Sequence, residues 1–242
     1  MDFLAKLKRF FKKYLINNKW RCLSCGKEIF NDARFCDECY RELPFNDKAI
    51  CDHCGREVVA FTNYCSTCKE NLLSIDKGRS VFNYKEPISD LIKRLKYGNR
   101  RYIAEYFIEV LSFTYLKNCF NADYITYVPM TEKAKRKRGY NQSEILAKGV
   151  SEKTNVKLFE GVIKIKETKR QATLNKKERY KNLKDAFKVT DKKALKEKTV
   201  VIIDDVTTTG TTAEVLASSL KRAGAKIVYL ITVASLPSKD KY

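Results

Sequence analysis

The chain has 242 residues, of which 44% are hydrophobic and 32% are charged, and 49 Lys and Arg against 29 Asp and Glu give a formal net charge of +20. This composition predicts a globular protein and excludes a disordered one. No apolar run approaches the roughly 18 residues that span a bilayer, and lysines interrupt the N-terminus where a secretory signal needs an apolar core. We therefore expect a cytoplasmic protein, and the positive charge favours phosphate-rich partners.

Residues 1–19 are predicted to form a separate basic amphipathic helix. Phe3, Leu7, Phe10 and Tyr14 recur at helical spacing, and lysines line most of the other face. Such a helix is able to lie on an anionic membrane surface. Packing against the protein itself or against a partner is the favoured interpretation, and peripheral membrane contact is the alternative.

Residues 20–75 are predicted to contain two copies of one zinc-binding unit. The spacing C-x2-C-x10-C-x2-C occurs twice, first as Cys22, Cys25, Cys36 and Cys39 and then as Cys51, Cys54, Cys65 and Cys68. Four thiolates in two knuckles are typical of structural zinc, whereas a disulfide framework would need a secretory context. We expect two zinc ions, one per unit in the simplest pairing, with an interleaved pairing left open.

The remaining histidine and cysteine narrow the possible chemistry. His53 is the only histidine and lies inside the knuckle C-D-H-C, so we interpret it as a residue that does not bind the metal. Without a second histidine, neither a Ser–His–Asp triad nor an HExxH site is possible. Cys119 lies in an aromatic-rich stretch and is predicted to be a small buried residue.

Residues 76–242 alternate between helix and strand patterns. We expect helical structure over 86–117, a strand over 123–130, a helix capped near Asn141, strands near 161–165 and 186–189, a buried strand over 199–204, a helix closed by Gly224, and a final strand over 226–234. This alternation predicts an α/β fold with a mostly parallel sheet and helices on both faces.

The stretch "VVIIDDVTTTGTT" at 200–212 carries the strongest functional signal. It follows a buried strand and precedes a helix, and ligands of such sheets bind at the carboxyl ends of strands. Helix N-terminal amides and threonine hydroxyls favour a phosphate. Two adjacent acids would repel that phosphate unless they hold ribose hydroxyls or a divalent cation. The sequence therefore predicts a phosphorylated ribose as ligand.

This stretch resembles the phosphoribosyl pyrophosphate (PRPP) motif of type I phosphoribosyltransferases. "LIKRLKYGNRR", "KRKRGYNQSEILA" and "RQATLNKKERYKNLKDAF" further resemble the ComF family, which is associated with DNA uptake in naturally competent bacteria. The resemblance covers about residues 20–235. It implies a type I phosphoribosyltransferase fold with a small N-terminal zinc-ribbon domain. The duplicated cysteine unit is a departure, because many members are expected to have one four-cysteine finger.

The resemblance also implies roles for individual residues. Asp204 and Asp205 should meet the ribose 2′- and 3′-hydroxyls, directly or through Mg²⁺. The 5′-phosphate should be held by Thr208, Thr209, Gly210, Thr211 and Thr212. Thr211 stands where such motifs often have Gly or Ala, so the loop is slightly altered.

Two basic segments complete the expected site. Met130, Thr131 and Arg138 match the pyrophosphate-binding loop of that fold, although "KAKRKR" is also readable as a solvated basic loop. Residues 166–184 are expected to form the mobile hood of a transferase, with Arg170, Gln171 and Arg179 as anion contacts. The alternative for this segment is a disordered lysine-rich loop.

Three functions follow. The favoured one is a PRPP-binding protein of DNA uptake that contacts single-stranded DNA or the uptake machinery, with a helicase-like translocation ATPase as a partner implied by the family. Trp20, Tyr97, Tyr102 and Tyr140 are available to stack on bases, although scattered aromatic residues more often belong to a core. The alternatives are an active phosphoribosyltransferase with an unknown acceptor, and a zinc-ribbon adaptor with a degenerate transferase fold.

Overall fold

The computed structural model describes residues 21–30, 33–59, 62–69, 74–98, 100–166 and 185–237. The helix expected within 1–19, Trp20, and the hood residues Arg170, Gln171 and Arg179 lie outside these ranges. No helix in the described ranges is both long enough and apolar enough to cross a bilayer.

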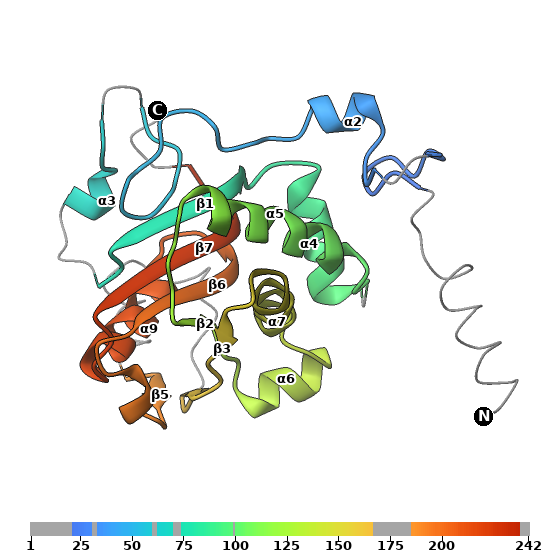
Figure 1. Cartoon of the computed structure of the whole chain (residues 1–242). Helices are drawn as coiled ribbons and strands as arrows, with labels where there is room; N and C mark the ends of the chain where they lie inside the picture. Colours follow the sequence, from blue (N-terminus) through green and yellow to red (C-terminus); the bar gives the residue numbers. More distant parts are fainter. Residues whose placement is uncertain are drawn as a thin grey trace, which may run out of the picture.

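Within the described residues, the centre of the molecule is a five-stranded parallel sheet with strand order β1-β7-β6-β2-β3 (Figure 1). In chain order its strands are β1 (Lys77–Asn83), β2 (Tyr124–Tyr127), β3 (Lys157–Leu158), β6 (Thr199–Thr207) and β7 (Ile227–Ser235). A separate antiparallel pair consists of β4 (Val162–Lys164) and β5 (Phe187–Val189). The predicted parallel α/β architecture is therefore confirmed, together with the two short strands.

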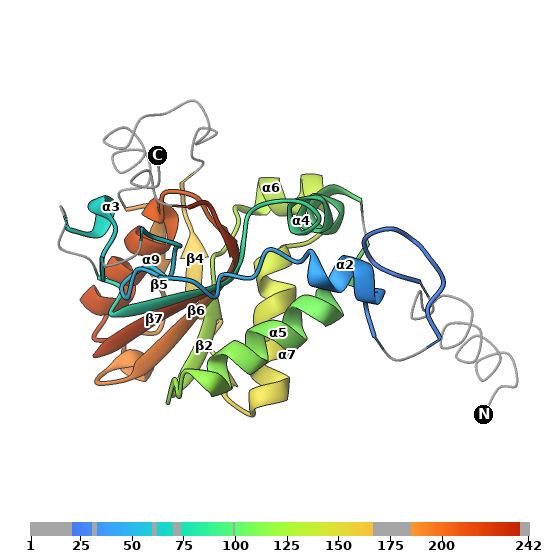
Figure 2. The same ribbon diagram turned by 90° about the horizontal axis from the view of Figure 1, so that it is seen from above.

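Both faces of the sheet are covered, which explains the apolar runs in its central strands. Successive side chains of a strand alternate between faces, so Val201 and Ile203 enter one core while Val200 and Ile202 enter the other. The first face is covered by α4 (Ile88–Tyr97), α5 (Ile103–Lys117) and α7 (Gln142–Thr154), and the second by α9 (Thr211–Arg222) (Figure 2).

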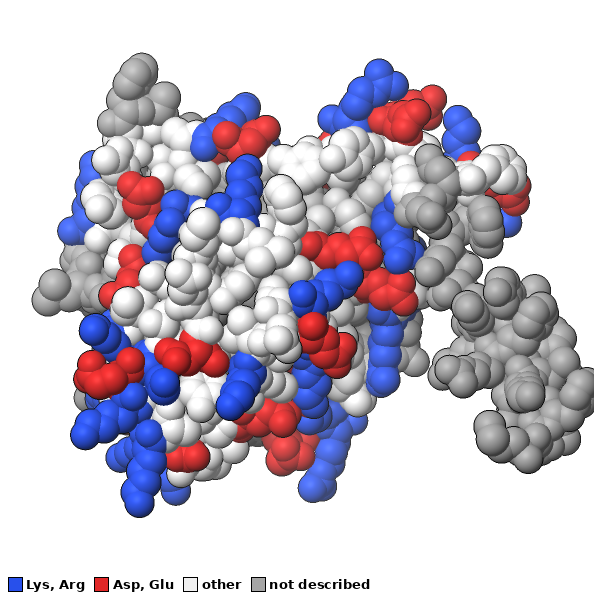
Figure 3. Space-filling view, in the orientation of Figure 1, with Lys and Arg blue, Asp and Glu red and all other residues white. Residues whose placement is uncertain are grey.

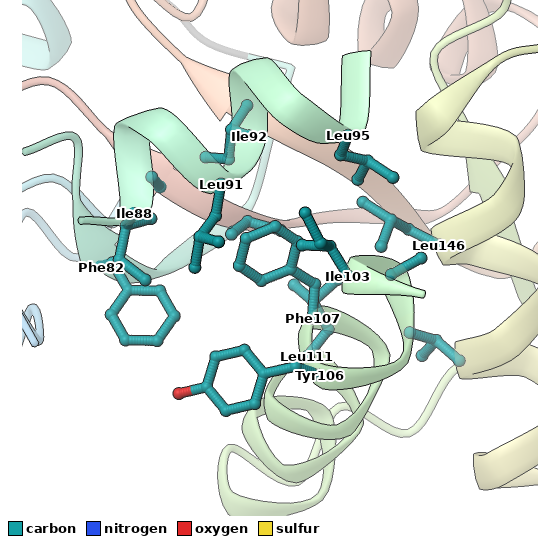
Figure 4. Close-up of a cluster of buried hydrophobic side chains, with 14 of the residues drawn as sticks. Phe82, Ile88, Leu91, Ile92, Leu95, Ile103, Tyr106, Phe107, Leu111 and Leu146 are labelled. Carbon is teal, nitrogen blue, oxygen red and sulfur yellow. The ribbon is translucent and has the colours of Figure 1, made fainter. Parts of the chain in front are cut away.

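The first core fixes the position of α4. Leu91 and Leu95 of α4 are fully buried and face Ile103 and Phe107 of α5, with Leu146 of α7 beside them (Figure 4). Each large apolar side chain buried in this way contributes about 1.5–3 kcal/mol to the free energy of folding. The C-terminal turn of α4, which carries Lys96 and Tyr97, is thereby held at the edge of the sheet.

Several local predictions need correction. The helical stretch 86–117 is confirmed and consists of two helices, because α4 ends at Tyr97 and the chain turns at Gly98 before α5. β1 and β3 were not predicted. The basic segment 132–138 is a helix, α6 (Glu132–Arg138), rather than a loop, because the Thr131 hydroxyl caps it by accepting from the Ala134 amide at 3.3 Å. The predicted cap at Asn141 is confirmed by its side chain accepting from the Ser143 amide at 3.1 Å.

Cys119 is exposed, so the prediction of a buried residue was wrong. The residue follows the C-terminus of α5 and has a φ of +51° in the turn that leads to Phe120. The turn places the side chain of Phe120 in the core instead, where the residue is 2% exposed. The aromatic neighbours of Cys119 in the sequence therefore do not surround it in space.

The two cysteine units occupy different sides of the molecule (Figures 1 and 2). The first unit includes α2 (Asp37–Arg41) and packs on α5, where the rings of Phe35 and Tyr106 meet edge to face at 4.9 Å between centroids. The second unit includes α3 (Ser66–Lys69) and lies against β1, near α9. The two copies of the cysteine unit therefore pack against different parts of the fold.

Candidate functional site

The cysteines form two compact clusters, one in each unit. In each cluster, the four sulfur atoms all lie within 4.8 Å of one another, and the sets are Cys22, Cys25, Cys36, Cys39 and Cys51, Cys54, Cys65, Cys68. The Cys25–Cys36 and Cys54–Cys65 sulfur distances are both 3.8 Å. A tetrahedral zinc site with Zn–S bonds of about 2.3 Å requires S–S edges of about 3.8 Å. These residues therefore fit one structural zinc per unit. The interleaved pairing is wrong, and His53 belongs to neither cluster.

The acid pair lies where the central strand loses one of its neighbours. β2 pairs with β6 only as far as Tyr127 opposite Ile203, whereas β7 stays paired with β6 up to Thr207. Asp204 is the first residue of β6 beyond the pairing with β2. The sheet therefore opens at its carboxyl edge beside the two acids, which is the usual ligand position in parallel α/β sheets.

The surroundings of Asp204 raise the pKa of its carboxyl group. The Ser143 hydroxyl donates to Asp204 Oδ1 at 2.7 Å, and the Asp205 amide donates to the same oxygen at 2.9 Å. Burial and the neighbouring Asp205 charge outweigh these hydrogen bonds and raise the pKa of Asp204 to about 7. The carboxyl group is therefore poised to lose its proton when a cation or a hydroxyl donor arrives near neutral pH.

Asp205 is more deeply buried and has a cationic partner. Only 4% of the residue is exposed, and its Oδ2 contacts the Lys96 ammonium at the end of α4. Burial alone would lower the pKa of Lys96, but attraction to Asp205 and Asp204 raises it. Lys96 and Ser143 both lie in the family-like segments of the sequence, yet neither was assigned a role there.

The threonine-rich loop leads directly into α9. Gly210 is the N-cap of this helix with a φ of +78°, and the hydroxyls of Thr209 and Thr211 lie 2.9 Å apart. The first amides of an α-helix have no intrahelical acceptor and carry the positive end of its dipole. The acid pair and the threonine-rich loop therefore follow one another at the carboxyl end of β6, as the sequence predicts.

The expected pyrophosphate-loop residues lie together. The Arg138 guanidinium donates to Gln142 Oε1 at 2.9 Å and lies 3.9 Å from the Met130 sulfur. It also covers the Tyr97 ring, at 5.2 Å from the centroid. Because Tyr97 follows Lys96 in the chain, these contacts connect the basic helix α6 to the neighbourhood of the acids.

Comparison with known families places both parts of the chain. A model described as a double zinc ribbon domain matches residues 19–69, and one described as a phosphoribosyl transferase domain matches residues 136–241. The double ribbon accounts for the duplicated cysteine unit that departs from a single finger.

Two curated relatives cover most of the chain. "Competence protein F" of Haemophilus influenzae is 28% identical over 85% of this chain and 86% of its own length. "DNA utilization protein YhgH" of Escherichia coli is 31% identical over 68% of this chain and 74% of its own length. Among solved structures, a purine phosphoribosyltransferase from Pyrococcus horikoshii aligns with 55% of this chain and 82% of its own, at a TM-score of 0.36 and 19% identity. From its two matched domains and these relatives, the chain belongs to the ComF family.

Proposed function

We propose that the chain binds PRPP together with Mg²⁺ at the carboxyl edge of β6. The observation that carries this proposal is the sequence of an acid pair, a threonine loop and a helix start at one opened sheet edge. The match of residues 136–241 to the phosphoribosyl transferase domain family supports it.

Each part of the edge has a task in this proposal. Asp204 and Asp205 take the ribose hydroxyls or Mg²⁺, since carboxylate oxygens suit both. Thr208, Thr209, Gly210, Thr211 and Thr212 take the 5′-phosphate at the start of α9. Arg138, with Met130 and Thr131, takes the pyrophosphate end. Mg²⁺ supplies charge neutralisation for the pyrophosphate when it is bound.

We also propose a role in DNA uptake, as the names of the relatives suggest. The proposed DNA contact is to single-stranded DNA at α6 and Tyr97. The last turn of α6 carries Lys135, Arg136, Lys137 and Arg138, and Tyr97 is 74% exposed beside Arg138. A cationic helix beside an exposed ring combines the two contacts that single strands require, which are phosphate neutralisation and base stacking.

Charge and burial limit where else the DNA could bind. Figure 3 shows basic and acidic side chains interspersed over the visible face rather than one continuous basic surface. Tyr140 is only 7% exposed, in contrast to Tyr97, so its ring is not available for stacking. A helicase-like translocation ATPase remains part of the proposal on family resemblance. A cytoplasmic location remains part of it on the sequence expectation alone.

The direct test is calorimetric titration of PRPP with Mg²⁺. Wild type should bind one PRPP per chain, and Asp204→Asn with Asp205→Asn should bind about a hundredfold more weakly or worse, because two charged hydrogen-bonding groups are lost. The matched control is Asp47→Asn with Asp191→Asn, which changes the same charge at exposed positions. The proposal fails if wild type produces no binding heat, or if the site variant binds like the control.

A further inference from the structure

The second cysteine unit is docked on the sheet through main-chain contact. A Cβ atom at Gly55 would lie 2.5 Å from the Arg79 Cα, and one at Gly78 would lie 2.7 Å from the His53 carbonyl oxygen. Asn46 donates to the Gly55 carbonyl at 2.7 Å. Because neither glycine has a side chain, the unit is held in contact with β1 itself, and the residue after Gly55 has a fixed position.

The unit is also tied to the helix that follows the threonine loop. Just beyond the second cysteine pair, the Ser74 amide donates to Glu214 Oε1 in the first turn of α9, at 2.5 Å. The second unit thus touches the sheet at β1 and the helix at its N-terminal turn. These two attachments place the backbone of the second zinc unit next to the start of α9, where the proposed site takes the 5′-phosphate.

Arg56, which follows Gly55, is a buried cation whose side chain lacks the usual partners. It is 5% exposed, and its Nε is buried without a hydrogen-bond partner. Among the described residues, no carboxylate forms an ion pair with its guanidinium. A buried, unpaired cation is costly, and buried charges are normally paired or hydrogen-bonded. An anion from outside the chain would supply the hydrogen-bond partner that the guanidinium lacks.

The guanidinium is directed at the start of α9. Its Nη2 lies 3.2 Å from the position that a Cβ would occupy at Gly210, where the φ of +78° also disfavours any side chain. Gly210 caps a helix of 12 residues. A planar guanidinium opposite free helix-end dipoles is the arrangement that binds a phosphate monoester by two or more charged hydrogen bonds.

We propose that Arg56 of the second zinc unit is a binding residue for a phosphate monoester at the N-terminus of α9, so that this zinc unit completes the ligand site. The inference rests on the proposed function in one respect, since the monoester there is the 5′-phosphate of PRPP. It also gives the duplicated unit a task that the first unit does not share.

The repeat supplies an internal comparison. Lys27 of the first unit occupies the position equivalent to Arg56, two residues after the second cysteine. Lys27 is solvent-exposed and has an acidic neighbour, with its ammonium 3.7 Å from Glu38. The same place in the repeat therefore carries an ordinary surface cation in one unit and a buried, unpaired one in the other.

The competing explanation is a counter-ion. A zinc ion with four thiolates carries a net charge of about −2, and Arg56 interacts electrostatically with Cys54. In that case Arg56 would serve zinc retention only. Arg56→Lys then keeps both zinc and ligand affinity at wild-type levels, whereas a phosphate-binding guanidinium is replaced poorly by lysine, which lacks the planar fork of donors.

The experiment measures binding of ribose 5-phosphate, and separately of PRPP with Mg²⁺, by calorimetry on the full chain, with zinc content determined on each sample. Arg56→Gln and Arg56→Lys are compared with wild type and with Lys27→Gln. We expect both Arg56 variants to bind either ligand more weakly, by about 10- to 100-fold for Arg56→Gln because a charged hydrogen-bonding group is lost. Lys27→Gln should bind normally, and Arg56→Lys should retain two zinc ions per chain.

The outcomes separate the two proposals. The role of Arg56 is overturned if Arg56→Gln binds both ligands with unchanged affinity. It is also overturned if Arg56→Gln loses zinc while Arg56→Lys keeps its zinc and its full ligand affinity. Either result leaves PRPP binding standing. Arg56-dependent binding of ribose 5-phosphate without binding of PRPP supports the role of Arg56 and overturns the proposed function. If wild type binds neither compound, both are overturned.

Discussion

Lys96, at the end of α4, contacts the Asp205 carboxylate of β6, so a cation from a distant part of the chain neutralises half of the acid pair. The two side chains are 21% and 6% exposed. The ion pair makes adjacent acids tolerable inside the fold before any ligand is present.

Removing the cation should therefore destabilise the fold. Lys96→Met leaves the Asp205 charge buried and unpaired, and losing one partner of a buried pair costs about 3–5 kcal/mol in the free energy of unfolding. Lys93→Met is the matched control, because Lys93 is exposed and only 3.7 Å from an exposed Glu86; such surface pairs contribute about 0–1 kcal/mol. Urea unfolding of both variants measures the difference. Combining Lys96→Met with Asp205→Asn should recover much of the loss, and a single variant as stable as the control would contradict this view.

The raised pKa of Asp204 makes stability depend on pH in a definite direction. Its pKa rises from 3.8, the ordinary value of a free aspartate side chain, to about 7 in the fold. Between these values the folded state holds a proton that the unfolded state has released, so this group's contribution to the free energy of unfolding decreases as pH rises from about 4 to about 7. Asp204→Asn removes that contribution. The variant should therefore gain stability relative to wild type at pH 8 and much less at pH 4, as measured by urea unfolding at each pH.

Asp123 provides a control of opposite sign for the same measurement. The Lys198 ammonium, 2.9 Å away, lowers the pKa of Asp123. Asp123→Asn should accordingly lose a small amount of stability at neutral pH, and this loss should shrink as the pH falls and the Asp123 carboxyl takes up its proton. If Asp204→Asn and Asp123→Asn shift the pH profile in the same direction, the account of Asp204 is wrong.

The two zinc units should respond differently to loss of a ligand. Cys54→Ser and the equivalent Cys25→Ser should each reduce the zinc content from two ions to one, because the clusters are separate. Only Cys54→Ser should weaken binding of ribose 5-phosphate, by about tenfold or more, since it releases the segment that holds Arg56. Mass spectrometry of the intact chain gives the zinc count and calorimetry gives the affinity. If the two variants bind ribose 5-phosphate with equal affinity, zinc binding by the second unit does not contribute to ligand binding.

The proposed DNA surface makes a prediction about both stacking and salt. Tyr97→Ala should weaken single-stranded DNA binding by about 1–3 kcal/mol, the contribution of one base stacked on an aromatic ring. Arg136→Gln should instead reduce the salt dependence of binding, since one fewer phosphate is neutralised. Fluorescence anisotropy with a labelled oligonucleotide at several salt concentrations measures both effects.

Phe113→Ala is the control for the aromatic change, because Phe113 is 64% exposed on α5 and has no cation paired with its ring among the described residues. It should bind DNA like wild type. A Tyr97→Ala protein that binds equally well at all salt concentrations would place the DNA elsewhere.

The sequence predicts the strands that are covered on both faces of the sheet. Residues 200–203 and 228–231 are hydrophobic without a break because both faces of β6 and β7 are covered, and the acid pair and threonine loop follow from their place after such a strand. The cysteine spacing predicts the zinc sites for an equally local reason, since each cluster is built within one short segment.

Other features depend on contacts between distant segments. β1 has no apolar alternation because Gly78 faces the backbone of the second zinc unit rather than a side-chain core. Lys96 lies among other basic residues in the sequence, and only the packing of α4 on α5 brings it to Asp205. Arg56 is separated from Gly210 by most of the chain, so no local pattern relates them.

The seam between Gly55 and Gly78 joins two main chains with no side chain between them. Most interfaces within a protein adapt by exchanging side chains of similar volume, but here there is nothing to exchange. A single methyl group added at either glycine would push the second zinc unit away from the sheet. The two copies of the repeat differ at many positions, but at this seam the second copy has no room for a side chain.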